Sequence, residues 1–297
     1  MMINNWQATL SASLEESLKT ILPQHQFSEV IRYSVFPTGK LFRPILVYAL
    51  AHDIGNITPN HSLLASAIEL HHTYTLIHDD LPAMDDDDFR RNRPSSHKKF
   101  SEWEAILAGD SLLSLSYEVL SQVEAKFLPE LLKSFAESTG PRGLILGQVL
   151  DLSGHNNKLE QILKLHELKT ARLIQLALTG SALLCHKKEL TSDMLELGKA
   201  IGINFQLLDD LCELTEAVNQ HEKEINPFIH FPPEKIIEII KINSVSIRTI
   251  CKHHQLKELQ NYINLYYAKI KETLEVHQVQ INKYFKFSKD DLEGLFN

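Results

Sequence analysis

The sequence of 297 residues contains little glycine or proline, with only 11 of each. Its β-branched and aromatic residues do not alternate with polar ones, as they would in half-buried strands. Strand-rich folds are therefore disfavoured, and we expect an all-α protein. With 43% apolar residues the chain can bury a sizeable core, and we expect a single domain over residues 1–297.

Cysteine is also scarce. The three cysteines at 185, 212 and 251 are far apart, which excludes a disulfide framework and indicates a reducing compartment. The sequence has no run of eighteen apolar residues and no features of a signal peptide, so neither a transmembrane helix nor export is expected. A cytoplasmic protein is the simplest expectation.

Positive charge is limited and scattered. The net charge is −8, and the basic residues form no stripe, which argues against a nucleic-acid-binding protein. The sequence also lacks a glycine-rich phosphate loop, which argues against kinases and dehydrogenases.

Negative charge, in contrast, is concentrated. Within ten residues lie six aspartates: Asp79, Asp80, Asp85, Asp86, Asp87 and Asp88. Like charges about 4 Å apart repel by about 4 kcal/mol at an effective dielectric near 20. Acidic runs are usually solvated loops, but this one follows an apolar helical segment at 63–77, and Pro82 interrupts that helix. The carboxylates therefore lie where a buried helix ends, as a metal-binding rim would.

Apolar residues at helical spacing predict the other elements. Expected helices cover residues 6–22, 45–52, 61 into the aspartate run, 101–122, 127–138, 144–152, 159–185 and 192–215, with amphipathic helices from 233 to 285. The helix at 101–122 is apolar almost all round, which predicts that it is buried. The one at 159–185 is long and carries Lys169 and Thr170 near its middle.

A second carboxylate set lies near the end of the helix at 192–215. Asp209 and Glu213 are four residues apart, so they share one helix face, and Asp210 lies beside them. Alone, this pattern is usually a solvated face. Two such sets facing each other across a bundle would build a metal site in its core.

Oxygen ligands without cysteine favour Mg²⁺ over Zn²⁺. His71, His72 and His78 have no accompanying cysteine, so we expect interior or phosphate-contacting histidines there. Mg²⁺ usually completes its coordination with water and phosphate oxygens. The predicted ligand is therefore a phosphate ester, and scattered cations beside glycine, proline or helix ends agree with it: Lys40, Arg43, Arg90, Arg91, Lys169 and Lys223.

Five sequence blocks carry a resemblance to a known family. They are GKLFRP at 39–44, HTYTLIHDDLPAMDDDDFRRNRP at 72–94, GQVLD at 147–151, KT at 169–170 and FQLLDDLCE at 205–213. In this order they resemble the trans-isoprenyl diphosphate synthases, most of all the bacterial farnesyl diphosphate synthases. The resemblance implies an all-α bundle around a deep apolar central cavity, usually in a homodimer. It also implies Mg²⁺-dependent 1′–4 condensation of dimethylallyl or geranyl diphosphate with isopentenyl diphosphate, giving farnesyl diphosphate, with about three ions bound alongside the diphosphate.

The resemblance also implies roles for individual residues. Asp79 and Asp85, with Asp80 beside them, would hold the Mg²⁺ that grips the allylic diphosphate, and Asp209, with Asp210 and Glu213, would hold a further ion. The allylic substrate would contact Arg90, Lys169, Thr170, Gln206 and the loop residue Lys223. Isopentenyl diphosphate would contact Lys40, Arg43, His72 and Arg91. The residues implied to be catalytic are Asp79, Asp80, Asp85, Lys169 and Asp209.

Product length would depend on Tyr74 and Thr75. They precede Asp79 by five and four residues, or about 6–7.5 Å along a helix, where the resemblance places the floor of the cavity. Plain core packing explains a tyrosine there equally well.

Three features depart from the family pattern. Thr38 replaces a glycine and Leu41 an arginine, Glu213 replaces an aspartate, and the loop at 214–226 is short and poor in cations. These departures predict a weak second metal site and a loop that is poorly ordered without ligand. They keep open a weakly active or non-catalytic homologue that acts as a binding or regulatory subunit. A geranylgeranyl diphosphate synthase is a further alternative, as is a class I terpene cyclase, which would not need Lys40, Arg43 or Arg91.

Overall fold

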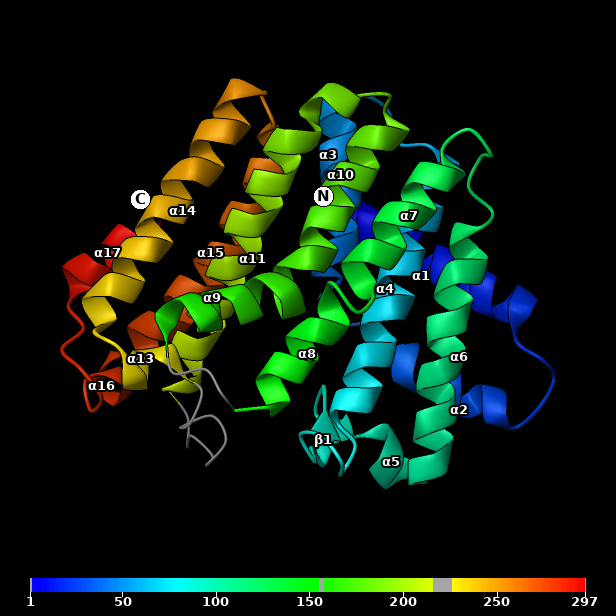
Figure 1. Cartoon of the computed structure of the whole chain (residues 1–297), viewed down its shortest axis with the longest axis horizontal. Helices are drawn as coiled ribbons and strands as arrows, with labels where there is room; N and C mark the ends of the chain where they lie inside the picture. The colour runs from blue at the N-terminus through cyan, green and yellow to red at the C-terminus, as the bar shows by residue number, and fades with distance from the viewer. Residues whose placement is uncertain (1, 155–157, 216–225, 297) are drawn as a thin grey trace. The chain divides into compact units, whose positions relative to one another are not determined.

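The computed structural model describes residues 2–154, 158–215 and 226–296, which are almost entirely helical (Figure 1). The predicted all-α class is confirmed. The helices are α1 (Met2–Ile21), α2 (Phe27–Val35), α3 (Phe42–Ile54), α4 (Pro59–Asp79), α5 (Ser96–Lys99), α6 (Glu102–Leu120), α7 (Leu128–Thr139), α8 (Leu144–Leu152), α9 (Leu159–His166), η1 (Glu167–Ala171), α10 (Arg172–Leu184), η2 (Lys188–Leu190), α11 (Thr191–Glu213), α13 (Pro227–His230), α14 (Pro233–His253), α15 (Lys257–Val276), α16 (Gln278–Ile281) and α17 (Lys289–Phe296). Two short strands, β1 (Phe89–Arg90) and β2 (Arg93–Pro94), pair antiparallel. No helix in the described ranges has the length and apolarity needed to span a membrane.

The chain divides into two compact units. The first comprises Met1–Lys133 and Leu183–Cys185, and the second comprises Ser134–Ala182 and His186–Asn297. That residues 1–297 form a single domain stays a prediction.

In the first unit, α4 packs against α1, α2, α3 and α6. It begins with a proline, and the preceding Thr58 exchanges capping hydrogen bonds with His61. Because most of α4 is buried, its direction is set by packing against the neighbouring helices. Its last residue, Asp79, is half-buried.

Helix α6 crosses close to the last turn of α4. A Cβ atom on Gly109 would lie 2.2 Å from Nε2 of His78, so only glycine permits this approach. The ring of His78 is held there, with Nε2 3.1 Å from the carbonyl oxygen of Ile106. The prediction that this helix is buried all round is wrong for its first half, because Trp103, Ile106 and Leu107 are exposed.

In the second unit, α11 packs against α9, η1, α14 and α15. Glycine at 202 lets α11 approach η1, since a Cβ atom there would lie 2.4 Å from Cα of Ala171. The predicted long helix at 159–185 is present as α9, η1 and α10 in succession, and η1 is a π-helical turn between the two α-helices. Such turns are frequent at functional sites, and this one carries Lys169 and Thr170.

Candidate active site

The aspartate run begins where α4 ends. The chain turns back after Leu81, and the backbone N–H of Asp85 donates a hydrogen bond of 2.9 Å to the carbonyl oxygen of Asp79. Both aspartates are half-buried. The turn therefore brings together the two residues that the sequence singles out as metal ligands.

Asp80, the residue after α4, is held by Arg90 from β1. Nε of Arg90 donates to Oδ1 of Asp80 at 2.9 Å, and Nη2 donates to the same oxygen and to Oδ2 of Asp87 at 3.0 Å. Burial raises the pKa of the Asp80 carboxyl, and the Arg90 hydrogen bonds oppose that rise. In this structure Asp80 orients Arg90, while its predicted part in metal binding stays a prediction.

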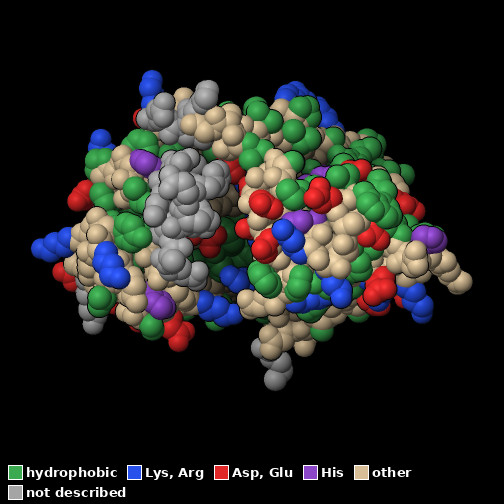
Figure 2. All heavy atoms as spheres, turned by 90° about the horizontal axis from the view of Figure 1, so that it is seen from below, with side chains coloured by type: hydrophobic (Ala, Val, Ile, Leu, Met, Phe, Trp, Pro, Cys, Tyr) green, Lys and Arg blue, Asp and Glu red, His purple; other side chains and the backbone are tan. Residues whose placement is uncertain are grey.

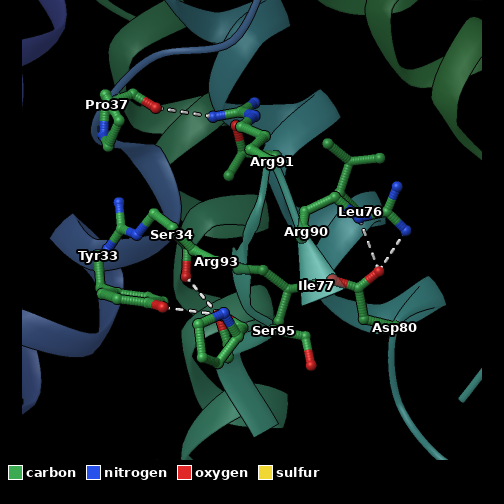
Figure 3. Close-up of a pocket in the computed structure, with 13 residues that line it drawn as sticks. Tyr33, Ser34, Pro37, Leu76, Ile77, Asp80, Arg90, Arg91, Arg93 and Ser95 are labelled. Carbon is green, nitrogen blue, oxygen red and sulfur yellow. Dashed lines mark hydrogen bonds and ion pairs between the residues drawn. The ribbon is translucent and has the colours of Figure 1, made fainter. Parts of the chain in front are cut away.

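The β1–β2 hairpin directs two adjacent arginines to different places. Its turn residues, Arg91 and Asn92, have φ angles of 55° and 59°, as a two-residue hairpin turn requires. Figure 3 shows Arg90 pointing at Asp80 and Arg91 pointing at Pro37, whose carbonyl oxygen accepts a 3.1 Å hydrogen bond from Nη1 of Arg91. The cavity of about 40 Å³ around them has room for water.

Arg91 belongs to a second group of cations. Its Nη2 lies 3.7 Å from Oε1 of Glu69, and Nη1 of Arg43 lies 3.2 Å from Nε2 of His72. A Cβ atom on Gly39 would lie 2.9 Å from Nη2 of Arg91, which explains the glycine in the first sequence block. The structure thus brings Arg43, His72 and Arg91 together, whereas Lys40 is exposed.

Glu69 organises this second group, and sequence reasoning missed it. Glu69 as a whole residue is 3% exposed. Burial raises its pKa to about 7, although Arg91 and Arg43 act in the opposite direction. Burial and the neighbouring arginines lower the pKa of His72 well below its usual value, so this histidine is neutral. One sequence signal could have identified Glu69: it is the only acidic residue in the apolar helical segment at 63–77.

Another part of the aspartate run gathers around a histidine. Candidate ligand atoms of Asp86, Asp88 and His97 lie within 4.8 Å of one another. However, Nζ of Lys98 lies 2.8 Å from Asp88 and 4.0 Å from Asp86, so a lysine already balances their charge. In Figure 2, which shows the molecule from below, acidic and basic side chains are correspondingly interspersed.

In the second unit, the GQVLD block explains how Lys169 is placed. A Cβ atom on Gly147 would lie 2.5 Å from the backbone nitrogen of Lys169, so this glycine lets α8 contact the π-helical turn. Asp151, one turn further along α8, forms an ion pair with Nζ of Lys169. Asp151 is buried, and it is a second residue whose contribution sequence reasoning missed.

A hydrogen-bonded series connects η1 with the second carboxylate set. Oγ1 of Thr170 donates to Oε1 of Gln206 at 2.9 Å, and Nε2 of Gln206 donates to Oδ1 of Asp210 at 3.1 Å. The other Asp210 oxygen lies 3.6 Å from Nε2 of His166. Burial lowers the pKa of His166 to about 4, so this histidine is neutral and supplies no positive charge.

This carboxylate set fits a divalent cation. Oδ2 of Asp210 is buried and accepts no hydrogen bond from any residue that the structure describes. Burial, and then the charges of Glu213, Asp209 and Asp151, raise the pKa of Asp210 well above its usual value. An ion beside these oxygens would relieve their repulsion, and oxygen-only donors are what Mg²⁺ prefers.

Glu213 is fixed at the end of α11. Its Oε2 accepts a 3.3 Å hydrogen bond from Nδ2 of Asn226, which also donates to the carbonyl oxygen of Asp210 at 2.7 Å. Lys223 lies outside the described residues, as does most of the loop expected to be poorly ordered.

The proposed chain-length residues lie inside the first unit. Tyr74 packs edge-on against His71 and His78, with centroid distances of 4.5 and 5.6 Å, and it is 7% exposed. Oγ1 of Thr75 donates to the carbonyl oxygen of His72 at 2.8 Å. Their role in product length stays a prediction.

Comparison with known proteins identifies the family. Residues 24–227 match the model of the family described as polyprenyl synthetase. The chain belongs to this family. A farnesyl diphosphate synthase from Micrococcus luteus is 35% identical over 196 residues, which are 64% of this chain and 67% of that protein. The predicted enzyme class, a prenyltransferase of the farnesyl diphosphate synthase type, is confirmed.

Two further proteins bear on the cofactor and the product. A crystal structure of a Helicobacter pylori geranyltransferase complexed with magnesium and isoprenyl diphosphate has a TM-score of 0.75 and 28% identity to this chain, and the match covers 88% of this chain and 97% of that one. Geranylgeranyl pyrophosphate synthase 12 from Arabidopsis thaliana is 37% identical over 203 residues, covering 65% of this chain and 56% of that protein. The similar proteins therefore include synthases named for products of two lengths.

Proposed function

We propose that this protein condenses dimethylallyl and then geranyl diphosphate with isopentenyl diphosphate to give farnesyl diphosphate. The observation that carries the proposal is the opposite placement of Arg90 and Arg91. Arg90 joins the aspartate set through Asp80, and Arg91 joins Arg43 and His72 at Glu69. Two separate cation groups suit two diphosphates, whereas a terpene cyclase binds only one.

The allylic diphosphate is proposed to lie at the aspartates. Asp79 and Asp85 would hold Mg²⁺, and Asp209, Asp210 and Glu213 would hold further ions, about three in all. When bound, the ions supply positive charge that stabilises the departing diphosphate. The chain's own donors to this substrate would be Arg90, Lys169, Thr170, Gln206 and Lys223.

Isopentenyl diphosphate is proposed to lie at the other cation group. Arg43 and Arg91 would bind its phosphates in a bidentate manner, with Lys40 adding a point charge. Neutral His72 would donate or accept a single hydrogen bond. Glu69 would act as a positioning residue, because a buried carboxylate beside Arg91 fixes that guanidinium before the substrate arrives.

The proposed chemistry needs no side chain that becomes covalently bound. As the allylic C–O bond breaks, the double bond of isopentenyl diphosphate attacks C1 of the allylic cation and forms the new C–C bond. The released diphosphate accepts the proton that the product loses. The role of the protein is to hold both diphosphates in place and to keep water from the cation.

A fifteen-carbon product is proposed because of Tyr74. Its ring lies on α4 one turn before the aspartates, where it would limit the depth available to a growing chain. A smaller residue there would suit the twenty-carbon product for which the Arabidopsis relative is named.

We also propose a homodimer in the cytoplasm. On α6, Trp103, Ile106 and Leu107 are 61%, 43% and 46% exposed. An apolar surface of this kind typically marks an interface. None of the three cysteines forms a disulfide, in keeping with a reducing compartment.

Product analysis tests the proposal. The purified protein is incubated with Mg²⁺, labelled isopentenyl diphosphate and either dimethylallyl or geranyl diphosphate, and the extracted product is sized. A C15 product is expected, and Asp79→Ala should lose most of the activity. A C20 product would favour the geranylgeranyl synthase. No labelled product at saturating Mg²⁺ would favour the non-catalytic homologue. The short loop at 214–226 after the second carboxylate set also suggests that alternative.

A further inference from the structure

A cleft of about 800 Å³ lies between α14 and α15 in the second unit. Its volume is in the range of small-molecule sites. Its residues lie beyond the 24–227 region that matches the family, and none is assigned to the proposed active site. Its cations are Arg248 and Lys252 on α14, and Lys257 and Lys271 on α15. We call these four residues and the groove between them the cationic cleft.

The charge of this cleft contrasts with that of the chain. Among the described residues that line it there is no carboxylate, although the net charge of the chain is −8. Lys271 is paired with Glu293 at 3.0 Å. Within the described part of the chain, Arg248, Lys252 and Lys257 form no ion pair with a carboxylate. Because like charges repel, a bound anion would be favourable here.

The rest of the lining combines four amide side chains, at 255, 260, 261 and 264, with apolar and aromatic residues. Tyr267 and Phe296 line the cleft with ring centroids 5.6 Å apart, and buried Leu256 and Cys251 also contribute. Lys252 and Lys257 flank the turn between the two helices, and Tyr267 lies ten residues further along α15, or about 15 Å. The turn end of the cleft therefore carries Lys252 and Lys257. The far end, which we call the aromatic end, carries Tyr267 and Phe296, and Lys271 there is neutralised by Glu293.

We propose that the cationic cleft binds a single-chain amphiphilic anion. Its phosphate or carboxylate head would lie between Arg248, Lys252 and Lys257, where arginine and lysine supply charge-assisted hydrogen bonds. Its apolar chain would extend along α15 over Tyr267 and Phe296. The aromatic end distinguishes this site from a simple anion-binding surface, because it stabilises only ligands that carry an apolar part.

Calorimetric titration of the full chain tests the head and the tail separately. Decyl phosphate and decanoate are titrated below their micellar concentrations in magnesium-free buffer with chelator, which prevents metal-dependent binding at the aspartates. Saturable 1:1 binding of one of them is expected, and which one binds identifies the head group. Inorganic phosphate should bind at least tenfold more weakly, and uncharged octyl glucoside should not bind. Equal affinity for inorganic phosphate would reduce the site to an adventitious ion only and overturn the proposal.

Variants locate the binding. Lys252→Ala is expected to weaken it about tenfold, the effect of losing one charge-assisted hydrogen bond. Lys269→Ala, at an exposed lysine on α15 that does not line the cleft, is the matched control and should bind normally. Ala268→Trp fills the apolar end without changing charge and should abolish binding. If folded Lys252→Ala and Ala268→Trp both bind as Lys269→Ala does, the cleft is not the site.

Discussion

At the scale of single residues, three buried carboxyl groups differ in what balances them. Glu69, Asp80 and Asp210 are 3%, 2% and 6% exposed, and burial raises the pKa of each. Glu69 and Asp80 have arginine partners, but Asp210 faces a neutral histidine. The first two therefore position cations, whereas the third needs an added one.

Glu69→Gln should change how stability depends on pH. The pKa of Glu69 is about 7 in the folded protein and about 4.5 otherwise, so the folded state binds more protons between these values. Stability contributed by this group therefore falls as pH rises from 4.5 to 7, by about 3 kcal/mol. Urea unfolding of both proteins at pH 5 and pH 8 should show a steeper fall in the wild type.

His71 affects the pH dependence of stability in the opposite direction. Burial lowers its pKa to about 3, so it adds stability as pH rises toward 6.5, opposite to Glu69. Because His71 is present in both proteins, its effect cancels in the comparison. If the unfolding free energies of the wild type and Glu69→Gln depend on pH in the same way, burial does not raise the pKa of the Glu69 carboxyl.

Asp151→Asn should weaken use of the allylic substrate. The substitution removes the ion pair between Asp151 and Lys169, and a hydrogen bond to a charged group is worth about 1.5–3 kcal/mol. That corresponds to a loss of roughly 10- to 100-fold in kcat/KM for geranyl diphosphate, with little change in KM for isopentenyl diphosphate. Steady-state kinetics with each substrate varied separately measure these two effects.

The matched control for this substitution is Asp290→Asn, at an exposed aspartate on α17. If Asp151→Asn lowers kcat/KM equally for both substrates, Asp151 stabilises the fold and does not specifically position Lys169.

At the scale of elements, α4 and α11 both position carboxylates. Each packs against several helices of its own unit, and each ends in carboxylates, so a rigid buried helix places the acidic groups. Glycines at the crossing points allow the close contacts: Gly109 beside α4 and Gly202 beside η1. Substitution at these glycines would move a whole helix end, because the atoms they face belong to a ring or to backbone.

Tyr74→Ala tests whether α4 limits product length. Removing the ring should allow chains longer than fifteen carbons, which chromatography of the dephosphorylated product would detect. Because Tyr74 also packs on His71 and His78, some loss of stability is expected, of the order of 3–5 kcal/mol for a large-to-small core change. An unchanged product from a folded variant would place the floor elsewhere.

Glu213→Asp tests the predicted weakness of the second metal site. Glutamate loses up to about 1.5–2 kcal/mol of rotamer entropy when fixed, and in this structure its carboxylate is held by Asn226. Aspartate, the usual family residue, should lower the Mg²⁺ concentration needed for half-maximal rate and raise turnover. A titration that matches the wild type would mean that Glu213 is fully competent or is not a ligand.

At the scale of the whole molecule, the exposed apolar face of α6 predicts self-association. Light scattering during size exclusion should give twice the chain mass of 33.9 kDa. Trp103→Glu should shift the protein toward the monomer, since it places a charge in a buried contact. Ile242→Glu, at a residue 59% exposed on α14, should leave the mass unchanged. A wild-type mass of 33.9 kDa would exclude the dimer under those conditions.

The sequence by itself determined the all-α class, most helix positions and the family. Helical spacing is a local property, so Leu10, Leu14 and Leu18 of α1 are buried as their spacing predicts. Acidic runs and motif blocks are local as well, which is why Asp79, Asp85 and Lys169 could be identified without a structure.

Only the tertiary structure decided which distant residues meet. The contacts of Glu69 with Arg91 and of Asp151 with Lys169 depend on how helices cross, and no spacing in the sequence encodes a crossing. The same reason explains the one wrong prediction about a helix. An all-round apolar helix does not reveal which face stays exposed, as on α6. The π-helical turn at Glu167–Ala171 could not be foreseen either, because apolar spacing continues through it.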